Sequence, residues 1–526
     1  MRCLRLLPLF AAAALAAQQP TEADARRFLD SAETQLAALA EPVGRMAWIA
    51  ATYITEDSEI LSARFQTEYA LTVQRLATTA ARFDATPMPD DLRRRFLLLK
   101  LSLAAPPPAD PALAGEMTRL QVGMEADYGR GQWCPPSGGT CLDLGALSRI
   151  IATSRNADSL RMAWEGWRTV SPPMRDRYAR FVALSNQGAR TLGFPDAGAM
   201  WRSGYDMPPD AFAAEVERLW QQVRPLYLQL HAYVRRRLRE HYGDQVPARG
   251  AIPAHLLGNM WAQQWSTVAD LILPAAAEPT FDLTAILRER GLDAAAMVRI
   301  GEGFFLSLGF DSLPATFWTR SQFTQPRDRN VVCHASAWNV DSRDDLRIKM
   351  CIEPTAEELV VIHHELGHNF YQRAYNTLPF LYQNGAHDGF HEAIGDAIAL
   401  AITPGYLQQV GLLDALPSAA ADTMLLLRQA LDKIAFLPFG LLVDQWRWGV
   451  FAGRTTPADY NRSWWDLRTR YQGVAAPGPR PAEAFDPGAK FHVPANVPYT
   501  RYFLAHVLQF QFYRSLCQAA GHQGPL

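Results

Sequence analysis

The sequence predicts a mainly α-helical protein, and two observations support that prediction. Apolar residues recur at spacings of three and four along most of the 526 residues, whereas stretches with strand character are few. A Pro-rich stretch at 104–111 interrupts the helices, but no repeat or low-complexity linker divides the chain. We therefore expect residues 18–526 to form a single domain.

The overall composition fits a globular protein with a large core, because 48% of the residues are hydrophobic and 20% are charged. The formal net charge is only −2. Nucleic acids and anionic membranes attract strongly basic proteins, so the charge indicates neither as a partner.

The N-terminal residues are typical of a secretory signal peptide, which we place at residues 1–17. Arg2 and Arg5 flank the start of an apolar run that is followed by alanines. A membrane anchor is the alternative, but the run is short for a span and no stop-transfer charges follow it. Cys3 precedes the run, which disfavours a lipoprotein. We expect a mature protein that is secreted or periplasmic and has no membrane attachment.

Two pairs of cysteines are placed for local disulfides. Cys134 and Cys141 flank a Pro-Pro-Ser-Gly-Gly turn, and Cys333 and Cys351 bracket a segment of extended character. An oxidising compartment would allow both pairings. A zinc–thiolate site is the weaker alternative because no C-x-x-C pair occurs, and Cys517 is left over.

Helical periodicity begins after Thr21, a candidate N-cap, and continues to about Leu103. Further amphipathic stretches are predicted at 178–192, 211–241 and 294–308.

The best strand candidates are residues 330–340 and 346–352. They could pair as a hairpin that presents a free edge to an extended peptide.

The stretch His-His-Glu-Leu-Gly-His at residues 363–368 predicts a metal site on a helix. His364 and His368 are four residues apart, so they stand on the same helix face, and Glu365 lies beside them. This spacing is typical of a zinc site whose carboxylate takes a proton from water. The alternative is a solvated helix face that carries two histidines by chance.

Glu392 is the candidate for a third ligand, since it precedes a second helical run at 393–402, beyond a loop that contains Gly385 and Gly389. Two imidazoles and one carboxylate, with water in the fourth position, make the catalytic form of a zinc site. Asp396 follows Glu392 by four residues and could accept the second ring proton of a ligand histidine.

The zinc motif is one of several recognisable segments, which follow one another in order over most of the chain. The others are 164–168, 255–263, 333–338, 389–396, 432–436, 485–492 and 497–503. Together they resemble the angiotensin-converting enzyme family, the peptidyl-dipeptidase A metallopeptidases. Because the chain contains only one set of catalytic motifs, it resembles a single-domain member of the family, of the bacterial type.

The resemblance implies a two-lobed helical ellipsoid with zinc at the bottom of a deep central channel and a small hairpin beside the zinc helix. It also implies hydrolysis of oligopeptides with release of dipeptides from a free C-terminus. Glu365 would be the general base on zinc-bound water, and Tyr502 with His492 would stabilise the oxyanion.

Substrate-binding residues also follow from the resemblance. Lys490, Tyr499 and Gln263 match the trio that binds the peptide's terminal carboxylate, in which Lys provides the charge. His334 and the backbone of Ala335 match positions that hold the substrate's main chain in strand-like pairing. Taken alone, a lysine is more often a solvated surface residue.

Chloride is a further expectation of the resemblance. Arg501 and Tyr205 match one anion site, and Arg168, Trp464 and Arg468 match a second. A bound halide is one way to balance a buried arginine, and a neighbouring carboxylate is another.

Two departures from the family pattern stand out. Residues 385–389 read Gly-Ala-His-Asp-Gly where animal members carry Ala-Asn-Pro-Gly. The resemblance therefore does not predict the conformation of this loop or the preference of the pocket beside it. The chain also stops at Leu526, where family members continue with further helices and the partner of the cysteine that Cys517 matches, so we expect a truncated or naturally short member.

Two rival functions are open. A thimet-type oligopeptidase has a similar zinc set, but a secretion signal and disulfides are not expected of it. A catalytically silent peptide-binding protein on the same fold is the other, and the intact Glu365 argues against it.

Overall fold

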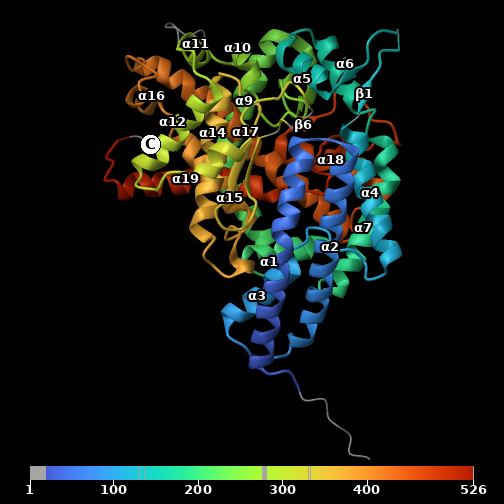
Figure 1. The fold of residues 1–526 in the computed structure, drawn as a ribbon. Helices are drawn as coiled ribbons and strands as arrows, with labels where there is room; N and C mark the ends of the chain where they lie inside the picture. Colours follow the sequence, from blue (N-terminus) through green and yellow to red (C-terminus); the bar gives the residue numbers. More distant parts are fainter. Residues whose placement is uncertain are drawn as a thin grey trace, which may run out of the picture.

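The computed structural model describes residues 19–129, 131–136, 138–274, 281–329, 331, 333 and 335–524. Helices dominate these residues and the strands are short, which confirms the mainly α prediction (Figure 1). The proposed signal peptide at 1–17 and the predicted substrate residue His334 lie outside the described residues.

The N-terminal helices are α1 (Glu22–Thr52), α2 (Glu56–Ala80) and α3 (Asp90–Leu101). They form the lower part of the molecule in Figure 1. Thr21 caps α1 as predicted, because its hydroxyl accepts a 3.2 Å hydrogen bond from the Asp24 amide. The Asp24 carboxylate in turn accepts one of 2.9 Å from the Thr21 amide, which completes a capping box.

The predicted stretches 178–192, 211–241 and 294–308 correspond to α7 (Arg175–Thr191), α9 (Pro209–Tyr242) and α12 (Ala294–Ser307). Further along the chain the helices are α4 (Pro111–Gly129), α5 (Leu144–Thr153), α6 (Ala157–Trp167), α7 (Arg175–Thr191), α8 (Ala197–Arg202), α9 (Pro209–Tyr242), α10 (Ala269–Ile272), α11 (Leu283–Glu289), α12 (Ala294–Ser307), α13 (Ala315–Arg320), α14 (Ala356–Tyr375), α15 (Asp388–Leu400), α16 (Pro404–Gln409), α17 (Ala419–Phe451), α18 (Tyr460–Leu467) and α19 (Thr500–Ala519).

Buried side chains form two separate clusters. The larger one surrounds α17 and includes the fully buried Trp164 and Trp446. The smaller one joins α12, α14 and the hairpin through residues such as Phe305, Ile362 and Leu366. Helix α15 packs against both α14 and α19, so it lies where the two clusters meet. This division fits the expected two lobes, while the deep channel stays a prediction.

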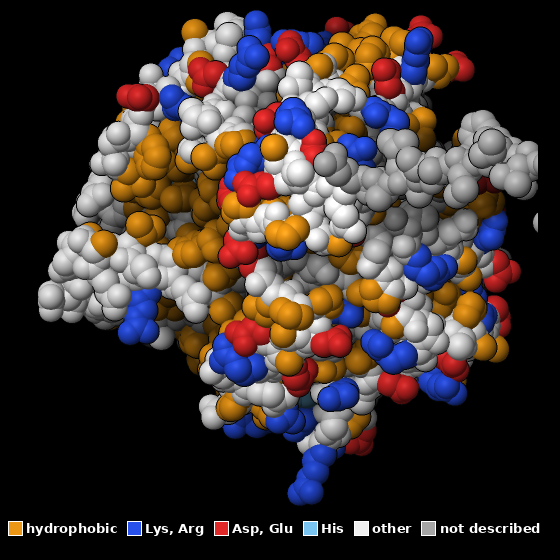
Figure 2. Space-filling view, turned by 90° about the horizontal axis from the view of Figure 1, so that it is seen from below, with side chains coloured by type: hydrophobic (Ala, Val, Ile, Leu, Met, Phe, Trp, Pro, Cys, Tyr) orange, Lys and Arg blue, Asp and Glu red, His pale blue; other side chains and the backbone are white. Residues whose placement is uncertain are grey.

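The surface is hollowed on one side. Figure 2 shows this face from below, with hydrophobic side chains gathered in the wall of the hollow.

The predicted hairpin is present in shorter form, as β4 (Ser336–Asn339) antiparallel to β5 (Leu346–Lys349). The far edge of β5 is covered, because the Met350 amide donates a 2.7 Å hydrogen bond to the carbonyl of Gln322. Two smaller sheets pair β1 (Gln132–Trp133) with β2 (Leu142–Asp143) and β3 (Ile252–Pro253) with β6 (Val474–Ala475).

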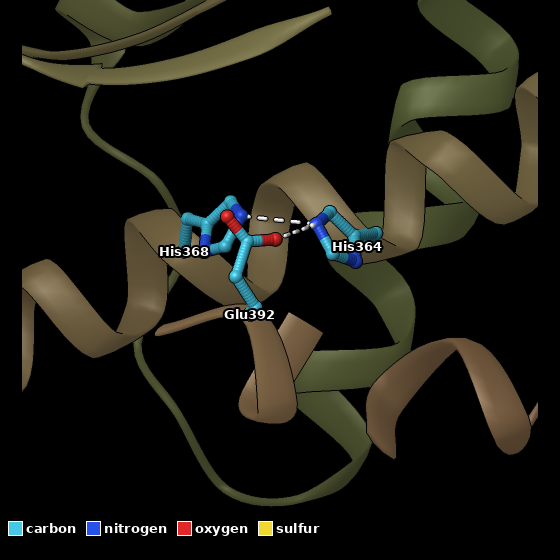
Figure 3. Close-up of side chains that lie close together, drawn as sticks. All are labelled: His364, His368 and Glu392. Atoms are coloured by element: carbon cyan, nitrogen blue, oxygen red, sulfur yellow. Dashed lines mark hydrogen bonds and ion pairs between the residues drawn. The ribbon is translucent and has the colours of Figure 1, made fainter. Parts of the chain in front are cut away.

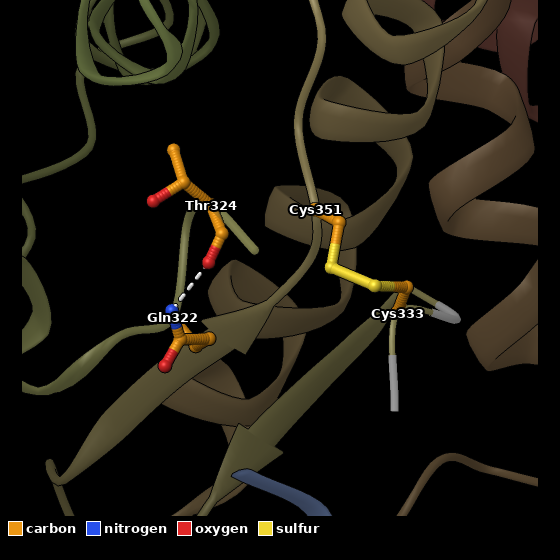
Figure 4. The surroundings of a disulfide bond; sticks show 4 residues. All are labelled: Gln322, Thr324, Cys333 and Cys351. Carbon is orange, nitrogen blue, oxygen red and sulfur yellow. Dashed lines mark hydrogen bonds between the residues drawn. A yellow bond between two sulfur atoms is a disulfide. The ribbon is translucent and has the colours of Figure 1, made fainter. Parts of the chain in front are cut away.

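Both predicted disulfides are present. Cys134 is bonded to Cys141 across the turn between β1 and β2. Cys333 is bonded to Cys351, which closes the open end of the β4–β5 hairpin (Figure 4). Among the described residues Cys517 is a free thiol. Within the same residues, no helix combines the length and the apolar character that a bilayer crossing requires.

Candidate active site

Helix α14 places two histidines of the metal motif on one face. Thr355 caps the helix by accepting a 3.2 Å hydrogen bond from the Glu358 amide. Leu359, Ile362 and Leu366 are buried in the smaller cluster, so they fix one face of the helix against the core. The other face carries His364 and His368, both half-buried.

Helix α15 begins at Asp388, five residues before the predicted start at Ala393. The reason is the side chain of His387, which caps the helix by accepting a 3.2 Å hydrogen bond from the amide of Gly389. Gly389, expected in the loop, is therefore in the first turn of the helix.

Two glycines let α14 and α15 approach closely. A Cβ atom on Gly367 would lie 2.9 Å from the Cα of Gly395, and a Cβ on Gly395 would lie 2.8 Å from Nδ1 of His364. Real side-chain atoms do not come so close, so only glycine fits at either position. The contact brings Glu392 of α15 opposite the histidines of α14.

The three candidate ligands converge (Figure 3). The Nε2 atoms of His364 and His368 are 3.0 Å apart, and Nε2 of His364 is 3.6 Å from Oε2 of Glu392. One donor atom from each residue lies within 4.8 Å of the others. Two imidazole nitrogens and one carboxylate oxygen form the donor set of a catalytic zinc site, so these residues fit zinc.

Asp396 orients the first ligand. Its Oδ1 is 3.4 Å from Nδ1 of His364, so the ring proton belongs on Nδ1 and Nε2 is left to face the other donors. Burial lowers the pKa of His364, but Asp396 and Glu392 outweigh burial and raise this pKa to about 10, a value for the ring when no metal ion competes with the proton on Nε2. Lys433 and Gln509 hold Asp396 in turn, at 3.4 and 3.1 Å.

His391 orients the second ligand, and the motif search missed it. Its Nδ1 is 3.2 Å from Nδ1 of His368, and its Nε2 is 2.9 Å from the hydroxyl of Tyr375. A ring hydrogen bond at Nδ1 of His368 leaves Nε2 for a metal. The only signal in the sequence was that His391 directly precedes Glu392.

Glu365 is placed to act as a base. It is 6% exposed, and burial raises its pKa to about 7 against the lowering effect of the positive charges nearby. The carboxylate accepts a hydrogen bond from the backbone of Ala337 in β4. Its Oε2 atom is buried and has no hydrogen-bond partner among the described residues, so it is available to water.

The predicted oxyanion residues lie together at the start of α19. The rings of His492 and Tyr502 are 5.5 Å apart between centroids, and those of Tyr499 and Tyr502 are 5.0 Å apart. Burial, with the nearby charge of Glu392, raises the pKa of Tyr502 to about 12. The hydroxyl of Tyr502 therefore keeps its proton at neutral pH and can donate it in a hydrogen bond.

Lys490 occupies an aromatic site without an opposite charge. Its Nζ lies 4.3 Å from the ring centroid of Trp261 and 5.3 Å from that of Tyr499. Among the described residues no carboxylate pairs with it, and burial lowers its pKa to about 7. The Tyr499 hydroxyl donates a 3.3 Å hydrogen bond to Oε1 of Gln263, so the predicted trio is brought together.

A buried ion pair of α17 positions this region, and sequence reasoning missed it as well. Arg447 and Asp444 are 0% and 2% exposed at their side chains. Arg447 donates hydrogen bonds to the carbonyls of His492 and Val497, at 2.8 and 2.5 Å. Asp444 accepts hydrogen bonds from the amides of Tyr499 and Thr500, at 2.6 and 2.7 Å. The pair thus fixes both the loop after Lys490 and the start of α19.

Arg168 and Arg468 are buried guanidinium groups without an ion-pair partner among the described residues. Arg168 is 3% exposed and donates to the carbonyls of Trp164 and Met260, and Arg468 is 1% exposed and donates to that of Trp261, each at 2.9 Å. The Nε atoms of both have no hydrogen-bond partner within the part of the chain that the structure describes.

The neighbouring Trp464 is 2% exposed, and its ring centroid lies 5.9 Å from the guanidinium carbon of Arg468. Two buried cations with spare donors fit an anion such as chloride.

Arg501 and Tyr205 have a different environment. Oδ2 of Asp388 lies 3.0 Å from Nε of Arg501, and burial together with this carboxylate raises the pKa of Tyr205. A carboxylate thus lies beside the arginine at which the resemblance implies a halide, and chloride binding at this site stays a prediction.

Ala335, the remaining predicted substrate residue, is half-buried and directly precedes β4.

The sequence profile of the peptidase M2 family, described as angiotensin-converting enzyme, matches residues 19–526. The chain belongs to the angiotensin-converting enzyme family. The chain is 45% identical over 519 residues to angiotensin-converting enzyme of Rattus norvegicus, and the match covers 96% of this chain but 39% of that protein. Members of this family are zinc metallopeptidases, and the His-His-Glu cluster is of the kind that holds zinc.

Two other relatives give the same assignment. Identity to angiotensin-converting enzyme of Theromyzon tessulatum is 46% over 384 residues, covering 72% of this chain and 62% of that protein. Identity to the angiotensin-converting enzyme-like protein Ace3 of Mus musculus is 40% over 513 residues, covering 96% of this chain and 69% of that protein.

Proposed function

We propose that this protein is a zinc-dependent peptidyl-dipeptidase that releases dipeptides from the free C-terminus of oligopeptides. One observation supports this proposal above the others, namely that the start of α19 adjoins two features that the reaction needs. The ring of Tyr502 lies 5.0 Å from that of Tyr499, whose centroid is 5.3 Å from Nζ of Lys490, and the charge of the candidate ligand Glu392 contributes to the raised pKa of Tyr502. A hydrolytic centre and a carboxylate-binding group would thus share one wall.

His364, His368 and Glu392 would hold the zinc ion. When bound, zinc would polarise the scissile carbonyl and lower the pKa of water. Glu365 accepts a proton from the attacking water through its unpartnered Oε2 and later returns it to the leaving amine. Tyr502 donates a hydrogen bond to the carbonyl oxygen as negative charge develops there, with His492 beside it.

Lys490 pairs with the terminal carboxylate of the peptide, and Gln263 and Tyr499 give it direction. A buried lysine without an ion-pair partner favours an anionic ligand, and its aromatic walls exclude water from the pair. Since this cation lies at a fixed place in the fold, it sets the distance from the peptide end to the cleaved bond.

The edge of β4 aligns the peptide's main chain. Alternate residues of a strand direct their backbone groups to the same edge, and the Ala337 amide is directed to Glu365. The backbone of Ala335, two residues earlier, then faces the same edge and pairs with an extended substrate, together with His334.

A chloride ion is proposed at Arg168, Trp464 and Arg468, where the Nε atoms of both arginines lack partners. The protein would be a single catalytic domain at 18–526 behind a signal peptide at 1–17. Two disulfides support a secreted or periplasmic location. Small peptides with a free C-terminal carboxylate would be the partners.

The test compares a blocked tripeptide with its C-terminally amidated form, each incubated with the zinc-loaded protein. We expect dipeptide release from the free acid alone, and its loss after a chelator removes zinc. Equal cleavage of both peptides would favour an endopeptidase such as the thimet-type rival, which the family match does not favour. Cleavage of neither would favour the silent peptide-binding protein.

A further inference from the structure

We propose that the carboxylate of Asp388 is a built-in counter-ion that takes the place of a halide at Arg501. The site formed by Arg501 and Tyr205 would then bind no anion from solution. The consequence for catalysis rests on the proposed function, whereas the occupancy of the site does not.

The contacts of Asp388 support this assignment. Its Oδ2 lies 3.0 Å from Nε of Arg501, and burial together with this carboxylate holds the pKa of Tyr205 well above its usual range. Tyr205 is therefore neutral, and the charges of Arg501 and Asp388 cancel. An anion entering the site would meet a carboxylate at close range, in a half-buried place where solvent screens charge poorly.

The same chain provides a contrast. Arg168 and Arg468 are more deeply buried than Arg501 and have no ion-pair partner among the described residues. A bound anion is therefore not required to balance the charge of Arg501, because the Asp388 carboxylate already does so. The Nε atoms of all three arginines lack a hydrogen-bond partner among the described residues, so what sets Arg501 apart is the carboxylate that forms an ion pair with it.

The place of Asp388 in α15 gives the pair a function. Asp388, Glu392 and Asp396 follow one another by four residues, so they lie along one face of the helix. Arg501 directly precedes Tyr502 in the first turn of α19. The ion pair therefore ties the helix of a metal ligand to the helix of the oxyanion donor.

A halide in this position would make that tie depend on the salt concentration, because the ion exchanges with solvent. A carboxylate on the chain cannot leave. The spacing between Glu392 and Tyr502 would thus be independent of chloride at this site.

The experiment compares the parent protein with the Asp388→Ala variant, purified without halide and crystallised, then soaked in bromide. Anomalous diffraction should locate bromide beside Arg168 and Arg468 in both proteins, and beside Arg501 in Asp388→Ala alone. Bromide at Arg501 in the parent would overturn the proposal. So would its absence from Arg501 in the variant, because the carboxylate would then not be what excludes it.

An activity measurement adds the functional consequence. The ratio of dipeptide release with chloride to that without should be at least about five times larger in Asp388→Ala than in the parent. Equal ratios would show that the tie does not affect catalysis. Asp90→Ala is the matched control, since Asp90 is an exposed acid in the first turn of α3. Because diffraction needs no turnover, failure of the peptidase proposal would leave the bromide result interpretable.

Discussion

At the scale of single residues, Glu365 is the group on which the proposed chemistry depends most directly. Replacing it with Gln keeps the shape but removes the base. We expect kcat to fall by about 10²- to 10⁴-fold while zinc stays bound, because Glu365 is not one of the converging donors. Steady-state kinetics and metal analysis of the same sample check this, and an active Glu365→Gln protein would remove Glu365 from the base role.

Lys490 gives the substrate affinity a dependence on pH. Burial lowers its pKa to about 7, so the free protein loses this charge as the pH rises through 7. Binding a carboxylate favours the charged form, and KM for a free-acid peptide should therefore rise by about tenfold per pH unit above 7. Steady-state kinetics with the free-acid peptide over a pH series measure this change in KM.

The matched variant is Lys490→Arg, because a guanidinium keeps its charge across this range. Its KM should not rise with pH above 7. A rise of the same size in Lys490→Arg would assign the pH dependence to another group.

Residues at this scale were also the most predictable part of the site. His364 and His368 could be recognised from a spacing that one helix converts into proximity, and Glu392 from its place at the start of the next helical run. His391, Arg447 and Asp388 act through partners between 16 and 113 residues away, so no local pattern could reveal them. The counter-ion of Arg501 was expected to be a halide because the resemblance came from motifs, and Asp388 lies at a departure from the motif.

At the scale of secondary-structure elements, the glycine contact between α14 and α15 controls the metal site. Gly395→Ala would put a Cβ 2.8 Å from Nδ1 of His364 and push the helices apart. We expect a loss of about 1–3 kcal/mol in the free energy of unfolding and a weaker affinity for zinc. Denaturant unfolding and competition with a chelator measure the two effects.

Gly303→Ala in α12 is the control, since its added Cβ meets nothing within 4 Å. This variant should be stabilised by about 0.5–1 kcal/mol, because alanine favours the helix. Equal behaviour of the two variants would contradict a role for the helix contact.

The buried ion pair in α17 is a second contact that positions the site. Arg447→Met leaves Asp444 as an unpaired buried charge and frees the carbonyls of His492 and Val497. The free energy of unfolding should fall by about 3–5 kcal/mol. The exposed pair of Arg462 with Asp459 supplies the comparison, because Arg462→Met should cost less than about 1 kcal/mol. Similar losses in both variants would argue against positioning by Arg447.

Element boundaries were predictable where capping residues mark them. Thr21 marks the start of α1 through a hydrogen bond from the Asp24 amide, and the two residues lie three apart in the sequence. The start of α15 was placed too late because His387 is an uncommon cap, and its role depends on the fold around Tyr205 and Phe390.

At the scale of the whole molecule, the candidate ligands come from helices where two buried clusters meet. Zinc bound to His364, His368 and Glu392 would hold α14 and α15 together. At a free zinc concentration about 100 times Kd, the folded state should gain about 2.7 kcal/mol, seen as a higher Tm. Calorimetry with and without a chelator measures it, and a Glu392→Gln variant should show a smaller difference. An unchanged Tm would mean that zinc does not bind at this junction.

The mainly helical class followed from the sequence, since periodicity is a property of each segment. How the segments pack into two clusters did not, because that depends on contacts between residues far apart in the chain.

The β4–β5 hairpin has one consequence for the choice of substrate. Gln322 pairs with the outer edge of β5 at Lys349, so a substrate strand would add to the sheet beside β4. A peptide must therefore arrive with its own backbone groups free. The last residues of a folded protein have usually committed theirs, whereas those of a short, unstructured peptide have not. The protein would then select substrates first by an extended, unpaired backbone and only afterwards by their side chains.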